Sequence, residues 1–327
     1  MTSLFFLSPE GVASGERARQ SIVQIVHDRS AERPQEPITL RSDLVIVPVR
    51  AFDRAGRPVR GLTADDFELF VEGKRQPIIF FSTEGEGEQL SRPLALVLLL
   101  DASGSIAATL HQQQSAVQSL LGRLGPQTML SVIRFSDRPH VVVPFTTAHQ
   151  DAARALAQMR RVEGPTAIFD ALLFAIHHFR TFSSPAVRKI VLLISDGLDT
   201  ASRIDHRECI RAAEQADVTV YSIHIPLYSP ANGYLRPRPP VRGFGDVAQA
   251  TGGRLFVVGS VAEALRPTAR TDLTTVFERI LDDIRTQYYL GCAPPESAPK
   301  GKYLRLMVRT RRSGVRVSSA RGGFYVR

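Results

Sequence analysis

The residues with the clearest chemical potential follow a short apolar run, LALVLLL, at positions 94–100. Asp101 ends this run, and Ser103 and Ser105 follow at alternate positions. An uninterrupted apolar stretch of this length predicts a strand that is buried on both faces, as in a parallel α/β sheet. Ligands of such sheets bind beyond the carboxyl ends of the strands, where Asp101 is expected to lie. One carboxylate and two hydroxyls offer only oxygen ligands, which suit a hard divalent cation.

Two further stretches place oxygen ligands in comparable positions. GPTAIFDAL opens a predicted helix after a Gly-Pro turn and presents the hydroxyl of Thr166. ISDGLDT follows the apolar strand KIVLLI and presents Asp196. If the strands are neighbours, both side chains converge with those of Asp101, Ser103 and Ser105 on one rim of the sheet. Two carboxylates and three hydroxyls approach the oxygen count of an octahedral Mg²⁺ shell, and Mn²⁺ or Ca²⁺ accept the same ligands.

Alternating strands and helices are expected to position these residues. Apolar strands are predicted near residues 94–100, 128–135, 140–145, 189–195, 218–225 and 254–258. Helices are predicted near residues 105–122, 149–160, 168–181, 205–216, 243–251 and 272–287. This alternation is typical of an α/β fold, a doubly wound and mostly parallel Rossmann-like sheet with helices on both faces. The turn residues 136–139 separate two adjacent strands and predict one edge hairpin.

Strand patterns also flank the α/β block. LVIVPVRAFD, FELFVEG and QPIIFFST precede it, with a hairpin expected at Gly73–Lys74, and TQYYLGC, KYLRLMVRT and VRVSSARGGFYV follow it. Three strands at each end are too few to be stable separately, so they are expected to pair into one small β-sandwich. The predicted domains are a mobile lead-in at 1–40, a β-sandwich at 41–84 plus 286–327, and the inserted α/β domain at 92–285. The proline-rich residues 226–242 are predicted to be a loop, either an inert excursion or a rim that contacts a ligand.

The five oxygen-bearing residues resemble the metal-ion-dependent adhesion site of the von Willebrand factor type A domain, Asp-x-Ser-x-Ser with a distant Thr and Asp. Asp101, Ser103, Ser105, Thr166 and Asp196 match all five positions in order. The resemblance implies that the two serines bind the ion directly, the threonine directly or through water, and the aspartates usually through water. It also implies that a protein ligand with an acidic side chain completes the shell.

The flanking segments resemble a bacterial subgroup of von Willebrand A-related proteins, many of them exported, and so does ATGGRLF at 250–256. This resemblance covers roughly residues 40–327. Pro165 is a departure, because glycine is usual in that turn, and the loop carrying Thr166 is expected to be stiffer.

Several of these residues also have purely structural interpretations. Asp and Ser after a strand also cap helices. Asp170 is expected to support the opening of the helix beside Thr166, and Asp199 to be a turn residue rather than a support of the ion's ligands. His177 and His178 are expected to be packing or surface residues.

Two other functions remain as alternatives to a binding module. A metal-dependent phosphatase or hydrolase is disfavoured, because Ser103 stands where an acid would donate the proton and no nucleophile motif appears. The second alternative is a structural von Willebrand A domain without a working ion site. The predicted protein is therefore not an enzyme.

Composition limits the remaining classes. The 327 residues carry a formal charge of +9, but the arginines are scattered, and Arg309, Arg311 and Arg312 are expected at a solvated hairpin end. A dispersed excess does not favour nucleic acid as partner. Cys209 and Cys292 form no disulfide framework or zinc motif. No stretch has transmembrane length, and residues 1–20 lack the pattern of an export signal, so the compartment and the oligomeric state stay open.

Overall fold

The computed structural model describes residues 44–83, 93–104, 117–118, 120–158, 160, 162, 164–182, 187–265, 273–295, 297–319 and 322–326. All of them belong to one compact unit, Ser42–Arg327. The predicted lead-in at 1–40, most of the helix predicted at 105–122, and Ser105 lie outside the described residues.

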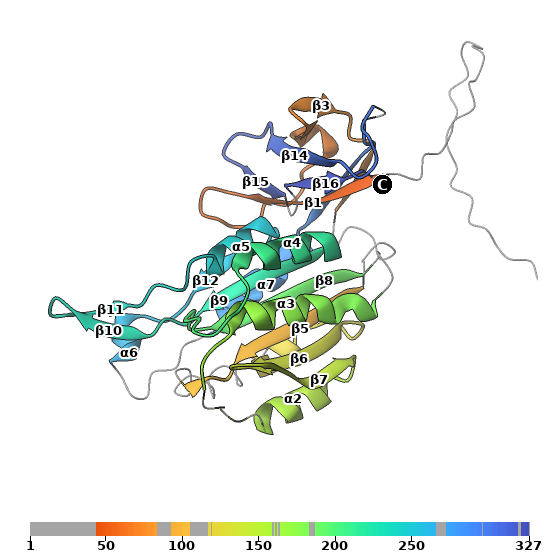
Figure 1. Ribbon diagram of the computed structural model, residues 1–327. Coiled ribbons are helices and arrows are strands. Elements are labelled where there is room, and N and C mark those ends of the chain that lie inside the picture. Colours follow the sequence, from red (N-terminus) through yellow and green to blue (C-terminus); the bar gives the residue numbers. More distant parts are fainter. Residues whose placement is uncertain are drawn as a thin grey trace, which may run out of the picture. The chain divides into compact units, whose positions relative to one another are not determined.

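A six-stranded mixed sheet is the centre of the described α/β block (Figure 1). Its strands are β5 (Leu94–Asp101), β6 (Met129–Phe135), β7 (Pro139–Thr146), β8 (Arg188–Ser195), β9 (Val218–His224) and β12 (Leu255–Val257). Their order is β12-β9-β8-β5-β6-β7, and every neighbouring pair is parallel except β6 and β7. The predicted doubly wound sheet and its edge hairpin are therefore confirmed.

Helices cover both faces of this sheet because its strands are apolar on both sides. Leu96, Leu98 and Leu100 of β5 pack into one buried cluster, whereas Val97 and Leu99 pack into another. The first cluster includes residues of α2 (His149–Gln158) and α7 (Thr274–Arg285). The second includes residues of α3 (Ile168–His178), α4 (His206–Ala216) and α5 (Phe244–Ala250). The short α6 (Val261–Ala264) lies beside the strand Tyr234–Pro237.

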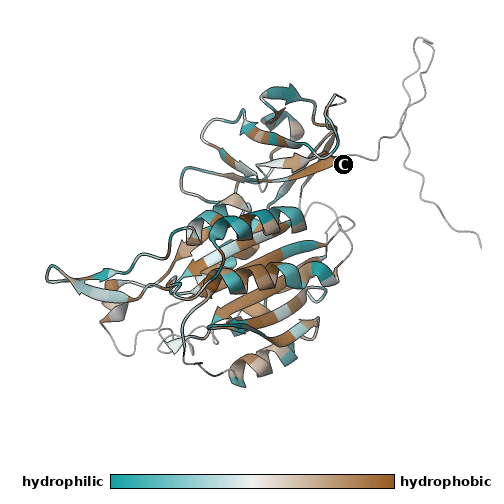
Figure 2. Ribbon diagram, in the orientation of Figure 1, coloured by the Kyte–Doolittle hydropathy of each residue, from teal (hydrophilic) through white to brown (hydrophobic). Residues whose placement is uncertain are grey.

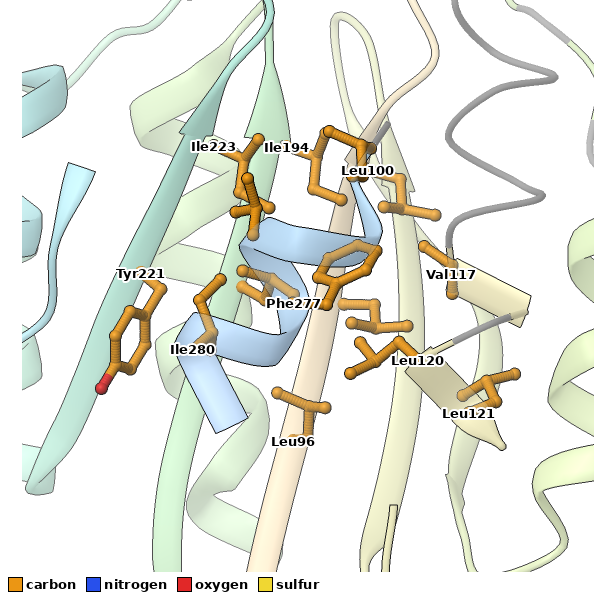
Figure 3. Close-up of a cluster of buried hydrophobic side chains, with 14 of the residues drawn as sticks. Leu96, Leu100, Val117, Leu120, Leu121, Ile194, Tyr221, Ile223, Phe277 and Ile280 are labelled. Carbon is orange, nitrogen blue, oxygen red and sulfur yellow. The ribbon is translucent and has the colours of Figure 1, made fainter. Parts of the chain in front are cut away.

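Figure 3 shows the cluster beneath α7, where Phe277 and Ile280 lie among side chains of β5, β8 and β9. Figure 2 shows that hydrophobic residues concentrate in the central strands, as burial on both faces requires. The apolar core thus places the carboxyl ends of β5 and β8 side by side, since Leu100 pairs with Ile194.

Strands from the two ends of the described chain pair with each other, as predicted. One sheet has the order β15-β1-β13-β4 and the other β16-β14-β2-β3. Their bounds are β1 (Val45–Phe52), β2 (Phe67–Val71), β3 (Lys74–Gln76), β4 (Phe80–Thr83), β13 (Tyr288–Cys292), β14 (Tyr303–Thr310), β15 (Arg316–Ser319) and β16 (Gly323–Tyr325). Val49, Leu69 and Leu290 lie in their shared core. The proposed domain boundaries stay a prediction.

Two predicted strands of these sheets are each split in the structure. The stretch QPIIFFST divides at Pro77: β3 pairs with β2, and β4 pairs with β13 in the other sheet. Proline lacks the N–H that a continuing ladder needs, which explains the break. The hairpin turn is centred on Glu72–Gly73 rather than Gly73–Lys74, and both turn residues have positive φ. The last predicted strand likewise forms β15 and β16. A capped turn at Thr63 precedes β2, in which the Asp66 carboxylate accepts from the Thr63 N–H at 2.8 Å.

Residues 226–242 are not simply a loop. They contain a hairpin of β10 (Tyr228–Ala231) and β11 (Tyr234–Pro237), paired in antiparallel register. Asn232 and Gly233 form its turn, with φ of 53° and 80°. An Asn-Gly pair is favoured in such two-residue turns because both positions need positive φ. The high proline content of this stretch led to the prediction of a loop, although the Asn-Gly pair indicates a hairpin turn.

A buried ion pair connects β1 with α7. Arg50 and Asp283 are only 3% and 1% exposed, and Arg50 Nη1 lies 3.5 Å from Asp283 Oδ2. Arg50 also donates to the Gly253 carbonyl at 2.9 Å and to the Tyr221 hydroxyl at 3.3 Å. Arg254 reaches the same carboxylate at 3.4 Å. The sandwich strand β1 is therefore joined to the α/β block by charge and hydrogen bonds as well as by chain connections.

We expect Gly253→Ala to destabilise the protein. A Cβ at this position would lie 1.6 Å from the carbonyl oxygen of Val220 in β9, so the backbone must shift. Overpacking of this kind costs about 1–3 kcal/mol in the free energy of unfolding. Urea denaturation of the full chain measures this loss. The matched change Gly125→Ala, whose Cβ meets no atom closer than 3.9 Å, is expected to leave stability unchanged; equal stability of the two variants would contradict the prediction.

Candidate metal site

Asp101 lies at the carboxyl end of β5 and is completely buried. Its Oδ1 accepts from the Ser103 N–H at 3.0 Å, and its Oδ2 accepts from the Ser195 hydroxyl at 2.6 Å. Burial, helped by the nearby charge of Asp196, raises the pKa of Asp101 to about 6, although the hydrogen bonds from Ser195 and Ser103 act to lower it. Asp101 therefore ends its strand as predicted, and the structure adds that the side chain is buried and not on an open surface.

Asp196 follows β8 and is also completely buried. Its Oδ1 accepts from the Leu198 N–H at 2.9 Å, but Oδ2 has no hydrogen-bond partner among the described residues. The ring of His224 contacts the Asp196 carbonyl oxygen through Nε2 at 2.9 Å, an interaction in which Nε2 is the donor. Burial lowers the pKa of His224, which favours its neutral form. The backbone is thus held in place while one carboxylate oxygen stays unsatisfied.

Backbone hydrogen bonds bring the Thr166 segment to the same rim. The Val162 N–H donates to the Ala102 carbonyl at 2.7 Å, next to Asp101. On its other side, Thr166 receives the Thr200 N–H at its carbonyl (2.8 Å) and donates its own N–H to the Thr200 hydroxyl (2.9 Å). Thr200 belongs to the loop that carries Asp196. The segment of Thr166, itself buried, is therefore hydrogen-bonded to both aspartate loops.

The helix that follows Thr166 is capped from the Asp196 loop. The carboxylate of Asp199 accepts from the Ile168 N–H at 3.0 Å, and the Ser202 hydroxyl accepts from the Phe169 N–H at 2.9 Å. Asp199 also accepts from the N–H of Ser202 at 3.0 Å, as a turn residue does. Such caps satisfy the unpaired N–H groups of a helix start. These hydrogen bonds hold the loop that carries Asp196 against the start of α3.

Asp170 has a second role besides the one predicted. It lies in the first turn of α3, where its negative charge favours the helix start as predicted, and its Oδ1 also accepts from the N–H groups of Arg203 and Ile204 at 2.9 and 3.2 Å. The cap comes from Asp199 and Ser202, which the sequence analysis did not assign to this helix. His178 is a packing residue as expected, stacked on Phe145 with ring centroids 4.7 Å apart.

Sequence reasoning missed Ser195. Its hydroxyl donates to Asp101 and accepts from the Gly197 N–H at 3.0 Å, so it connects the two acidic loops. The available signal was its position as the last residue of an apolar run, opposite the residue that ends β5. Of the five predicted ligands, Asp101, Ser103, Thr166 and Asp196 are described, and Ser105 is not.

The donors at this rim fit a hard divalent cation better than a softer metal. Two buried carboxylates and the hydroxyl-bearing residues Ser103 and Thr166 supply oxygen ligands only, as Mg²⁺, Mn²⁺ or Ca²⁺ prefer. Across the described part of the chain, no three His, Cys, Asp or Glu residues gather around a point where a metal ion could bind, so an ion at this rim would need the Ser and Thr hydroxyls as ligands. The unsatisfied Oδ2 of Asp196 is the kind of buried polar atom that a bound ion explains.

Comparison with known proteins identifies the class. Residues 95–236 match the family model of the von Willebrand factor type A domain. Residues 95–236 of the α/β block are therefore a von Willebrand factor type A domain. This confirms the predicted resemblance to the domain, whereas the five-residue ion site stays a prediction.

With some relatives the matched region is longer than this domain. An uncharacterized protein of Synechocystis sp. is 31% identical over 203 residues, which are 59% of this chain and 44% of that protein. Human integrin alpha-D is 22% identical over 47% of this chain and 14% of its own length. The chain thus spans less than half the length of these relatives.

An aerotolerance-related membrane protein from Bacteroides fragilis has a solved structure with a TM-score of 0.47 and 15% identity, covering 58% of this chain and 98% of that one. No helix in the described ranges has the length and apolar character of a membrane span.

Proposed function

We propose that the rim formed by Asp101, Ser103, Ser105, Thr166 and Asp196 binds a divalent cation, Mg²⁺ first, with Mn²⁺ and Ca²⁺ as alternatives. Through this ion the protein binds an acidic side chain of a protein partner. The observation that carries the proposal is the buried Oδ2 of Asp196, which has no hydrogen-bond partner among the described residues and lies at the same rim as the buried Asp101.

Electrostatics support an ion at this position. Asp101 and Asp196 are both buried, and neither forms a salt bridge with a described Lys, Arg or His. Buried charges are normally paired or bound to a metal, because removing a carboxylate from water is costly. A divalent cation would balance both carboxylates. Because serine and threonine ligands are neutral, the ion itself could still bind an acidic group from outside as a further ligand.

A binding role fits the site better than catalysis does. Domains of this family are generally interaction modules, and integrin alpha chains are among the relatives. A phosphatase that uses an aspartate nucleophile after a buried strand needs a proton donor two residues later. That position is Ser103, whose side chain does not act as an acid near neutral pH.

Isothermal titration calorimetry of the full chain with MgCl₂, MnCl₂ and CaCl₂ tests the proposal. We expect one ion to bind per chain, with the heat abolished by prior addition of EDTA. Absence of binding for all three ions would show that the domain has no working ion site, and would leave the structural alternative.

The affinity for the ion is expected to fall at acidic pH. In the ion-free protein burial raises the pKa of Asp101 to about 6. Above that pH the carboxylate is charged and ready to bind, whereas below it a proton competes with the ion. Metal binding releases such protons, so we expect about tenfold weaker Mg²⁺ binding at about pH 5 than at about pH 7. Calorimetry at the two pH values measures this ratio; an unchanged affinity would contradict the role of Asp101.

A further inference from the structure

The hairpin β10–β11 is anchored on both sides of Asp196. At its start, the Ile225 N–H donates to the Ser195 carbonyl at 2.9 Å. At its end, the Val241 N–H donates to the Gly197 carbonyl at 2.7 Å. Gly197 has a φ of 76°, and a Cβ there would lie 2.5 Å from Cβ of Pro240, so the returning chain lies directly against the loop. The hairpin therefore rises from the rim of the proposed ion site.

The hairpin is built to be rigid. Its strands pair from Tyr228 with Pro237 to Ala231 with Tyr234, and the Arg238 N–H closes the base by donating to the Leu227 carbonyl at 2.7 Å. The stretch also contains five prolines: Pro226, Pro230, Pro237, Pro239 and Pro240. Proline restricts φ and lowers the conformational entropy of a chain. A surface held this way loses little freedom when a ligand binds it.

Fold stability does not explain the hairpin. No residue of Tyr228–Pro237 belongs to a described hydrophobic core. Figure 1 shows the hairpin extending away from the rest of the α/β block, on the side to which the β5 arrow points, and Figure 2 colours it mainly polar or neutral. A projecting, rigid segment without core residues is typical of a binding element on a stable scaffold.

The surface of this segment is positively charged. Residues 226–242 contain three arginines and no acidic residue. Arg236, Arg238 and Arg242 are exposed and form no ion pair with any described residue. Tyr234, next to the turn, is 73% exposed. Tyr and Arg are enriched in protein interfaces, and Arg binds carboxylates with both amino groups.

We infer that the hairpin β10–β11 is a second contact surface for the partner, and that the partner is a protein segment with several acidic side chains. This inference rests on the proposed function. With an ion bound, the charges of Asp101 and Asp196 are balanced, so the three arginines set a positive field beside the rim. One acidic side chain of the segment would reach the ion, and its acidic neighbours would pair with the arginines.

A fluorescein-labelled peptide of Glu, Asp and Gly residues is the probe, with binding to the full chain measured by fluorescence polarisation in MgCl₂. The test variant is the triple change Arg236→Gln, Arg238→Gln and Arg242→Gln. The matched control removes the same charge from exposed basic residues of the sandwich: Arg54→Gln, Lys74→Gln and Arg316→Gln. We expect the hairpin variant to bind about tenfold more weakly and the control to stay within about twofold of wild type. Both variants are expected to keep the wild-type Tm.

Three results would overturn the inference: no binding of the peptide to wild type at millimolar concentration, equal weakening by both triple variants, or no weakening by either. Repeating the titrations in EDTA separates this inference from the proposed function. If the hairpin variant weakens binding but EDTA does not, the arginine surface stands and the ion-bridged contact fails. If EDTA abolishes binding but the hairpin variant binds like wild type, the ion site stands and the hairpin has no part in recognition.

Discussion

Asp101→Asn is expected to abolish the rise in Tm that MgCl₂ produces in the wild-type protein. Asn keeps one oxygen that can accept from the Ser103 N–H, and its amide nitrogen can donate to the Ser195 hydroxyl oxygen in place of the present bond, so the side chain stays hydrogen-bonded while the charge is lost. A ligand present at 100 times its Kd stabilises a protein by about 2.7 kcal/mol. For a chain of this size that corresponds to a Tm shift of about 4 °C. Differential scanning fluorimetry with and without MgCl₂ measures the shift.

Asp170→Asn is the matched control. It removes the same charge from a carboxylate that binds only the backbone of Arg203 and Ile204 among the described residues. This variant is expected to keep the full response to MgCl₂, even where its own Tm is lower. A wild-type response in Asp101→Asn, or a lost response in both variants, would exclude Asp101 from the ion site. Asp196→Asn is expected to behave like Asp101→Asn.

The central sheet could be predicted from the sequence because a strand that is buried on both faces is apolar at every position. Each inner strand is an uninterrupted apolar run, as β5 and β8 show. The pairing of the two ends of the chain was also predictable, since neither set of strands is stable alone. The split at Pro77 was not predicted, because the apolar pattern continues across it and only the missing N–H marks the change of sheet.

Long-range partners explain what sequence reasoning missed around the site. Asp199 and Ser202 cap α3 from a loop about thirty residues away, and no local pattern relates them to that helix. Ser195 acts on Asp101 only because β5 and β8 are neighbours. The predicted ligands on the described chain do follow from type and spacing, since each lies just after a strand or at a helix start. Their binding of an ion remains a proposal, as does the role of Ser105.

The ion pair between Arg50 and Asp283 leads to the second large expected effect. Asp283→Leu leaves Arg50 buried without its carboxylate, and removing one partner of a buried pair costs about 3–5 kcal/mol. Arg50→Met is expected to cost less. Burial already raises the pKa of Asp283, against the opposing charges of Arg50 and Arg254. Its carboxyl group can therefore take up a proton when Arg50 is absent, whereas a guanidinium cannot lose one.

The double variant Arg50→Met, Asp283→Leu separates charge from packing. Replacing both partners of a buried pair with apolar residues is often close to neutral, so the double variant is expected to recover most of the stability that Asp283→Leu loses. Denaturation of the full chain in guanidinium chloride measures all three variants. If the double variant is as unstable as Asp283→Leu, the loss comes from packing of β1 against α7 and not from an unpaired charge. Arg50→Met is further expected to lose stability as pH rises, because the buried Asp283 carboxylate must then be charged without Arg50. If the loss of stability does not depend on pH, Arg254 alone is sufficient to balance the charge of Asp283.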